Sequence, residues 1–396
     1  MNANRLPRAG GTAFAGMVFR MALGWGLILA WMGSAVAQES PSAKYLGERN
    51  CRHCHGTAEW TRMEQYLIWH EKDAHSRSFA ALRGPLSREI ARWMSLPEGR
   101  PEEWEKCIRC HVGEADPTMR GPHYTLEEGV SCEACHGRAE HWLAPHVLFD
   151  ATHSTNVAHG MTDLKDLVTR ARVCLSCHGG LDHEIVAAGH PDLSFELLHD
   201  SFWQPPHWNY KEASPFAFWA VGQAVAVELA LRRLSTAEAD PTTGKNLHVE
   251  AFDDAACFRC HQKLIQDRWR NVEGHFSVLR PLIERLAPGE STKRLVEAVE
   301  RIGSEIDPHR ATDRAQLRGH AEAAAKSAEE VARSVARLAS STPSEDQIHA
   351  LIEEIAKPVP MASDSAFPSP HLPTAWVVRY FDLAEQKTLA LKCLTL

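Results

Sequence analysis

Residues 129–137 read GVSCEACHG, and the Cys-x-x-Cys-His pentapeptide within this stretch is repeated along the chain. The five copies are Cys51-Arg-His-Cys54-His55, Cys107-Ile-Arg-Cys110-His111, Cys132-Glu-Ala-Cys135-His136, Cys174-Leu-Ser-Cys177-His178 and Cys257-Phe-Arg-Cys260-His261. Two thiols three positions apart can bond to the two vinyl groups of a porphyrin, and the His that follows then lies under the iron as its proximal ligand. The repeat therefore predicts five covalently attached c-type haems.

The cysteine count argues against the two other common uses of closely spaced cysteines. Ten of the 11 Cys belong to the five motifs, and only Cys393 remains outside them. Zinc knuckles need no His at a fixed fifth position, and a disulfide framework would not place all cysteines but one in the same pentapeptide. Haem attachment is the better interpretation, and Cys393 is assigned no function.

The N-terminus has the pattern of an export signal. Three Arg precede or border an uncharged apolar run at 21–33, and Ala35-Val36-Ala37 is a small-residue cleavage site. The alternative is an uncleaved anchor, because the uncharged stretch 21–37 has 17 residues, at the lower limit for a spanning helix. We predict a cleaved signal peptide at 1–37, a periplasmic mature protein and no membrane span after processing.

The net charge of the mature chain favours a soluble protein that interacts with other proteins. Removing the three Arg of the leader leaves 40 basic and 51 acidic side chains, a formal net charge of 40 − 51 = −11. An acidic surface is repelled by nucleic-acid phosphates. It can steer the protein toward basic patches on redox partners, such as small c-type cytochromes and oxidoreductases.

Helical periodicity dominates the segments between the motifs, and no strand alternation is apparent. Apolar side chains recur at helical spacing in Glu59–Phe79 and in Ala217–Leu234. The second segment is apolar enough to suggest a membrane span, but Gln223 and Glu228 favour a buried helix. We predict a mainly α fold with little strand, in which the haems form much of the core. Only 25 residues separate Cys107 from Cys132, so the second and third haems are expected to be near neighbours.

The chain divides into a pentahaem cytochrome domain at 38–270, a helical module at 271–357 and a Pro-rich extended tail with a short terminal segment at 358–396. Apolar residues in the module step by four and three, as in an antiparallel helical hairpin followed by a possible third helix. They are Leu295, Val299, Ile302, Ile306, Leu317, Ala321, Ala324, Ala328, Val331, Val335, Leu338, Ile348, Leu351, Ile352 and Ile355. The sequence leaves three roles for this module: docking on the haem domain, self-association, and packing within the chain without a further function.

Further histidines are needed if the irons have a second protein ligand. Of the 23 His, five follow the second cysteine of a motif as proximal ligands, and 18 remain. Neutral imidazole binds iron well, but no spacing rule identifies distal ligands. The preferred candidates are His75, His146, His183, His190 and His207, followed by His123 and His141 and then by His248 and His275.

Three segments resemble the cytochrome c-554 family of multihaem cytochromes. They are YLGERNCRHCHG at 45–56, GVSCEACHG at 129–137 and HEIVAAGHPDLSFEL at 183–197, the last followed by His207-Trp208. The resemblance covers about 45–269 and implies closely stacked haem pairs, mostly with two His on each iron, and electron transfer linked to nitrogen-compound oxidation. The chain departs from the family in having five motifs instead of four and a long helical tail.

Two classes of function fit these observations. An electron carrier needs six-coordinate haems and no catalytic residue, and this is the preferred interpretation. The alternative is a multihaem oxidoreductase that acts on a small nitrogen or sulfur compound at one open-coordination haem. Ammonia-forming nitrite reductases resemble this chain in carrying five haems, but their active haem is attached through a Cys-x-x-Cys-Lys motif, which this sequence lacks.

Overall fold

The computed structural model describes residues 43–56, 63–96, 100–113, 116–181, most of 185–208, 214–236, 264–305, 314–338 and 343–356. Several sequence predictions fall outside these residues and stay predictions. They concern the leader at 1–37, His183, His248, the fifth motif at Cys257–His261, and the tail at 358–396 with Cys393.

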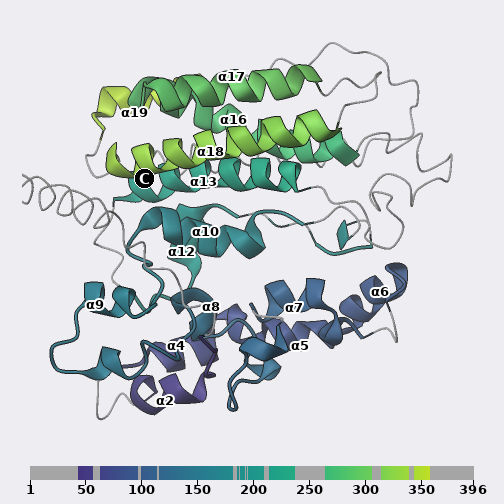
Figure 1. The fold of residues 1–396 in the computed structure, drawn as a ribbon, viewed down its shortest axis with the longest axis vertical. Coiled ribbons are helices and arrows are strands. Elements are labelled where there is room, and N and C mark those ends of the chain that lie inside the picture. The colour runs from purple at the N-terminus through teal and green to yellow at the C-terminus, as the bar shows by residue number, and fades with distance from the viewer. Residues whose placement is uncertain are drawn as a thin grey trace, which may run out of the picture.

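Long helices fill one half of the molecule, and short helices joined by loops fill the other (Figure 1). The long ones are α13 (Pro215–Ser235), α16 (Leu264–Leu286), α17 (Glu290–Glu305), α18 (Arg314–Leu338) and α19 (Glu345–Ala356). The short ones are α2 (Arg49–His55), α4 (Gln65–Lys72), α5 (Ser78–Leu82), α6 (Pro85–Trp93), α7 (Glu105–His111), α8 (Cys132–His136) and α9 (His153–Ala158). Two further helices, α10 (Leu167–His178) and α12 (Leu197–Trp203), lie between the halves. The described residues form no sheet, only an isolated bridge between Tyr45 and Arg120, so the predicted mainly α fold is confirmed.

Helix α13 is the centre of the long-helix half. It begins with a Ser214 cap and Pro215 at its first position, and both residues favour a helix start. Most of its residues are buried, including Gln223 and Glu228, as expected for a helix covered on nearly all sides. The helix predicted from the sequence at 217–234 is confirmed. No helix in the part of the chain that the structure describes is long and apolar enough to span a bilayer.

The C-terminal helices belong to the same hydrophobic core as α10, α12 and α13. Helices α17, α18 and α19 confirm the three helices predicted in the module. Their apolar residues, from Leu295 to Ile355, are buried in one cluster that also contains Val168 and Leu175 of α10. The predicted boundary at 270/271 falls within α16, which is continuous from Leu264 to Leu286. Because the seam of α18 is buried within its own chain, it gives no support for self-association.

The short-helix half has only a small protein core. Phe79, Leu82, Ile108 and Val112 form a separate buried cluster there. The continuous helix predicted at 59–79 is wrong, because α4 ends at Lys72 and a 3-10 turn at Ala74–Arg77 precedes α5. Asp73 causes the break, since its backbone is extended and its carboxylate accepts from the backbone N–H of His75, which favours a new turn.

Two glycines of the GVSCEACHG stretch hold α8 against its neighbours. Gly129 and Gly137 both have positive φ, 67° and 83°, which side-chain-bearing residues rarely adopt. A Cβ at Gly129 would lie 2.6 Å from the carbonyl oxygen of His75, and one at Gly137 would lie 2.6 Å from Thr162 Oγ1. The backbone of the third motif can therefore approach the loop that carries His75.

Two buried glutamates tie the N-terminal segment to α8. Glu133, inside the third motif, is 1% exposed and accepts hydrogen bonds from the backbone N–H groups of Leu46, Gly47 and Ala139 at 2.7–2.9 Å. Glu128 is 8% exposed and accepts from the N–H of Glu48 at 2.9 Å. Burial raises the pKa of both carboxyls, and that of Glu128 reaches about 7.

The raised pKa of Glu128 makes the stability of the fold depend on pH. In the unfolded chain this carboxyl ionises near 4.5, whereas in the fold it keeps its proton until about pH 7, with the nearby Glu48 and Glu133 adding to the effect of burial. Between these values only the folded state holds the proton, so stability falls as pH rises. We expect wild type to lose about 2 kcal/mol more than Glu128→Gln between pH 5 and pH 8, allowing for partial solvent screening. Urea unfolding at both pH values measures this, and equal losses would contradict the prediction.

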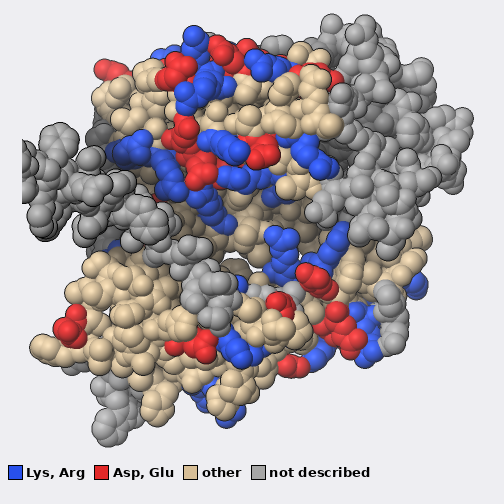
Figure 2. All heavy atoms as spheres, in the orientation of Figure 1, with Lys and Arg blue, Asp and Glu red and all other residues tan. Residues whose placement is uncertain are grey.

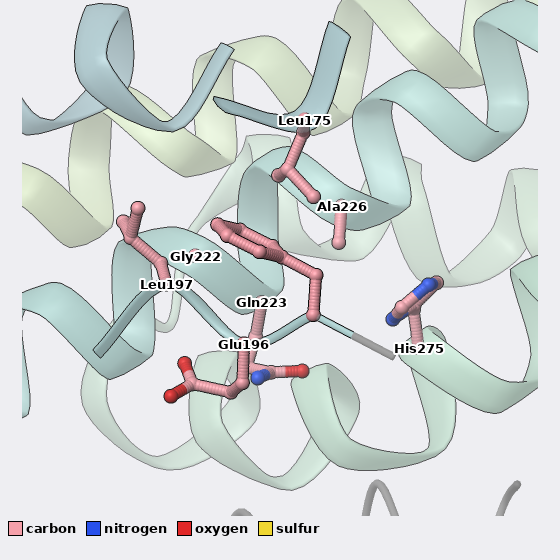
Figure 3. Close-up of a pocket in the computed structure, with 8 residues that line it drawn as sticks. Leu175, Glu196, Leu197, Gly222, Gln223, Ala226 and His275 are labelled. Atoms are coloured by element: carbon pink, nitrogen blue, oxygen red, sulfur yellow. The ribbon is translucent and has the colours of Figure 1, made fainter. Parts of the chain in front are cut away.

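A small cavity remains where α12 and α16 meet α13 (Figure 3). It is lined by Leu175, Phe195, Leu197, Gly222 and His275, among others. Gly222 allows the close approach of α12, because a Cβ there would lie 2.7 Å from Leu197 Cβ. Burial lowers the pKa of His275 to about 4, so its ring is neutral in this apolar setting.

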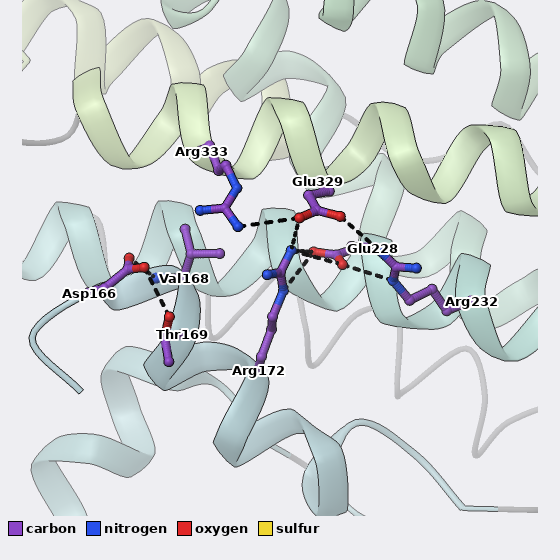
Figure 4. Close-up of polar contacts among 8 residues, drawn as sticks. All are labelled: Asp166, Val168, Thr169, Arg172, Glu228, Arg232, Glu329 and Arg333. Atoms are coloured by element: carbon purple, nitrogen blue, oxygen red, sulfur yellow. Dashed lines mark hydrogen bonds and ion pairs between the residues drawn. The ribbon is translucent and has the colours of Figure 1, made fainter. Parts of the chain in front are cut away.

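An ion-pair network joins α10, α13 and α18 (Figure 4). Glu228 of α13 is 1% exposed, and it accepts from Arg172 Nη2 and Arg232 Nε, each at 2.9 Å. Glu329 of α18 bridges the same two arginines at 3.0 and 2.8 Å and also contacts Arg333 at 3.3 Å. Basic and acidic side chains accordingly alternate across the middle of the face seen in Figure 2. The network fixes α10, whose last turns hold the fourth Cys-x-x-Cys-His motif.

Candidate haem-binding centres

Each described motif lies at the C-terminal end of a helix. Helices α2, α7, α8 and α10 end at His55, His111, His136 and His178. Residues three and four apart share one face of a helix, so both thiols and the imidazole of a motif point to the same side. The eight described motif cysteines form no disulfide. This geometry suits two thioether bonds and one axial ligand to the same porphyrin.

Three of these four histidines face a second histidine ring to ring, and the fourth, His136, has His207 nearby. The ring centroids are 6.4 Å apart for His55 and His146, 6.3 Å for His111 and His190, and 6.0 Å for His178 and His75. Burial, with a smaller effect from the neighbouring His207, lowers the pKa of His136 to about 4. The structure thus brings four of the five preferred distal candidates opposite a motif histidine.

The spacing of the rings can be compared with the size of an iron site. A bond of about 2 Å from metal to imidazole nitrogen, and roughly 1 Å from that nitrogen to the ring centroid, give about 6 Å between two rings that share one metal. The observed spacings of 6.0–6.4 Å agree with this value. Neutral imidazoles are also the protonation state that binds iron, so these residues fit a haem with two His ligands.

Hydrogen bonds on the Nδ1 atoms orient most of these rings. The acceptors are neutral for five of them: Gln65 Oε1 for His55 (3.1 Å), Ser78 O for His111 (2.7 Å), Leu143 O for His146, Pro191 O for His190 (2.8 Å) and Pro205 O for His207 (3.4 Å). A hydrogen bond that occupies Nδ1 leaves Nε2 as the nitrogen available to a metal.

His75 differs because its Nδ1 donates to the carboxylate of Asp73, at 2.9 Å. Asp73 is only 3% exposed and also accepts from Gln204 Nε2 at 2.9 Å. Burial alone would raise the pKa of Asp73, but the hydrogen bonds from His75 and Gln204 lower it to about 2. The Asp73 hydrogen bond in turn raises the pKa of His75, against the effect of burial. Sequence reasoning missed Asp73, although an Asp two residues before a candidate ligand was a usable signal.

The motifs themselves are close neighbours in space. The thiol of Cys51 contacts that of Cys132, and the thiol of Cys110 contacts that of Cys177. The first motif therefore adjoins the third, and the second adjoins the fourth. A Cβ at Gly113, just after α7, would lie 2.9 Å from Ala134 Cβ in α8, so the second and third motifs are also adjacent, as their short separation predicted.

The segment that carries His207 is held by aromatic packing. Trp208 stacks on Phe218 of α13 with ring centroids 5.6 Å apart. The guanidinium of Arg170, from α10, lies 4.2 Å from the centroid of the Trp208 ring. Arg170 is half-buried and close to Cys135, Cys174 and His136. Sequence reasoning missed this cation, which has no motif that would identify it.

The remaining candidates do not join these pairs. His123 and His141 are exposed, and neither faces a motif histidine among the described residues. His275 lies on α16 beside the cavity described above, where its Nδ1 has no hydrogen-bond partner. The position of the fifth motif, which lies outside the described residues, decides whether His275 has a role at that haem.

The helical fold and these centres define a c-type cytochrome. Residues 50–137, which contain the first three motifs, match the family described as cytochrome c554 and c-prime. The match confirms the resemblance to this family that was drawn from the sequence motifs. Searches among curated proteins and among solved structures found no match to the chain. The chain therefore binds c-type haem covalently and takes part in electron transfer with redox partners.

Proposed function

We propose that the chain is an exported, periplasmic pentahaem cytochrome that passes single electrons between redox partners through closely spaced, mostly bis-His haems. The observation that carries the proposal is the pairing of each described motif histidine with a second imidazole. Two axial imidazoles leave no open position on an iron, so such a centre accepts and releases electrons but binds no substrate.

Named residues would hold four of the haems. The axial pairs are His55 with His146, His111 with His190, His136 with His207 and His178 with His75, and the two cysteines of each motif supply the covalent attachment. Cys257, Cys260 and His261 would attach the fifth, with His183 a candidate for its distal side. A bound haem supplies a one-electron couple whose potential depends on its ligands and surroundings.

The arrangement of the motifs supports transfer between haems. Contacts between Cys51 and Cys132 and between Cys110 and Cys177 bring two pairs of motifs together, and the closeness of Cys135 to Cys174 joins the pairs. Partners with basic surfaces suit the acidic mature chain. Their exchange of electrons with it is expected to weaken as salt is added.

Distal ligation can be tested by replacing His75, His146, His190 and His207 singly with Ala. Each variant should convert one low-spin haem to a high-spin haem that binds carbon monoxide, because one axial position becomes open. Absorption and electron paramagnetic resonance spectra of the oxidised and reduced holoproteins measure the change. His159→Ala is the matched control, since His159 is exposed at the end of α9 and should leave all spectra unchanged.

The wild-type spectra test the carrier function itself. Only low-spin signals, slow binding of carbon monoxide and a mass increment of five haems would support it. A high-spin component near one-fifth of the total haem, with turnover of hydroxylamine, nitrite or tetrathionate, would instead establish the oxidoreductase alternative.

A further inference from the structure

We propose that Asp73 gives the haem site between His178 and His75 the lowest potential of the four described sites. The inference rests on the proposed function, because it concerns a haem bound between these two rings. Asp73 would be a positioning residue that acts on the iron through the His75 ring.

The physical basis is the charge placed on the far side of the ligand ring. A carboxylate that accepts the Nδ1–H of an axial imidazole makes the ring a stronger electron donor. A stronger donor stabilises the oxidised iron more than the reduced iron, so the potential of that haem falls. Among the eight imidazoles of the four described pairs, His75 is the one whose Nδ1 donates to a carboxylate, since the other Nδ1 hydrogen bonds seen go to neutral oxygens.

The surroundings of Asp73 preserve its charge. Three donors point at its carboxylate: His75 Nδ1 at 2.9 Å, the His75 backbone N–H at 3.0 Å and Gln204 Nε2 at 2.9 Å. Three donors require an acceptor without a proton of its own, which is the ionised carboxylate. No Lys or Arg of the described residues forms an ion pair with it. At 3% exposure, water screens the charge little, so the His75 ring experiences most of its effect.

The cation Arg170 does not distinguish this site from its neighbour. It is close to Cys135 and His136 of the third motif and to Cys174 of the fourth motif, and its guanidinium packs against Trp208. Its charge therefore acts on both haem sites. The Asp73 carboxylate, by contrast, accepts a hydrogen bond from one axial ligand, His75 of the fourth-motif site, and so lowers the potential of that site relative to its neighbour.

The test is a redox titration of the intact holoprotein in wild type and in Asp73→Asn. Asn has the shape of Asp and still accepts a hydrogen bond, but it carries no charge. At a fixed ambient potential we expect the reduced-to-oxidised ratio of one haem to rise about tenfold, which corresponds to a shift of about 59 mV for a one-electron couple. The shifted haem should be the most negative of the four haems attached at the described motifs, and its resonance spectrum should change while it stays low-spin.

Asp163→Asn is the matched control. Asp163 makes the same contact with a histidine, to His153 Nε2 at 2.9 Å, but His153 is exposed and belongs to no pair. This variant should leave every potential unchanged.

Gln204→Leu gives a second measurement in which the potential should shift in the opposite direction. Without the hydrogen bond from Gln204, the Asp73 carboxylate interacts more strongly with the His75 ring. The same haem should then become more negative, a result that loss of structure alone would not produce.

The outcomes separate this inference from the proposed function. Unchanged potentials in Asp73→Asn and Gln204→Leu, with five low-spin haems retained, would overturn the role of Asp73 and leave the carrier function standing. A shift in a haem other than the most negative of the four attached at the described motifs would also overturn it. Wild-type protein without bis-His haems would instead contradict the proposed function.

Discussion

Replacing Cys132 and Cys135 together with Ala is expected to remove one haem and to destabilise the short-helix half of the protein. The third motif contacts the first through Cys51 and lies beside the fourth through Cys174. The protein core in that half is small, so the loss of a porphyrin there resembles the deletion of a large core side chain. We expect the free energy of unfolding to fall by about 3–5 kcal/mol. The mass of the denatured protein and its pyridine haemochrome absorbance measure the haem count.

Cys393→Ala is the control for this experiment, because Cys393 is the single cysteine outside the motifs. It should retain every haem and the stability of wild type. A double variant that keeps its full haem content, or that loses one haem without any loss of stability, would show that the third motif does not support the fold as described.

Glu228→Ala should have the second-largest effect, on the junction of α10, α13 and α18. Glu228 is 1% exposed and binds both Arg172 and Arg232. Its removal leaves two cations together at a site shaped for a carboxylate, and loss of one partner from a buried ion pair typically costs about 3–5 kcal/mol. Both arginines are partly exposed and keep their contact with Glu329, so we expect about 3 kcal/mol. Urea unfolding followed by circular dichroism and by haem absorbance measures the loss.

Glu322→Ala is the matched control, because Glu322 also pairs with a cation, Lys326, one helical turn away on α18. That pair is exposed to solvent, where screening leaves an ion pair with little effect on stability. A cost for Glu228→Ala no larger than that of Glu322→Ala would show that the network does not stabilise the junction.

The sequence predicted the parts of this structure that depend on local pattern. The motifs fix their own helical geometry, the apolar run at 217–234 requires a buried helix, and the four-three steps from Leu295 to Ile355 define three helices. These features need only a few neighbouring residues. The distal histidines could not be chosen by such a pattern, because the motif histidine that each one faces lies far away in sequence: His75 faces His178, and His146 faces His55.

Features set by tertiary contacts could not be predicted from local sequence patterns. The break at Asp73 depends on a carboxylate that caps a turn and also binds Gln204, 131 residues later. Helix α16 runs across the predicted boundary at 270/271, and no composition change marks the start of this helix. Arg170 was missed since its place beside Trp208 arises only when α10 and the segment after His207 meet.

The shared core of α10, α13 and the C-terminal helices also determines the order in which the molecule is built. A chain is made from its N-terminus, so the first four haem-attachment motifs precede every residue of α16, α17, α18 and α19. Those late helices supply the side chains, from Val272 to Ile355, that cover α13. The side chains of α13 and α10 that pack in this cluster therefore cannot be fully buried until the C-terminal helices have been made.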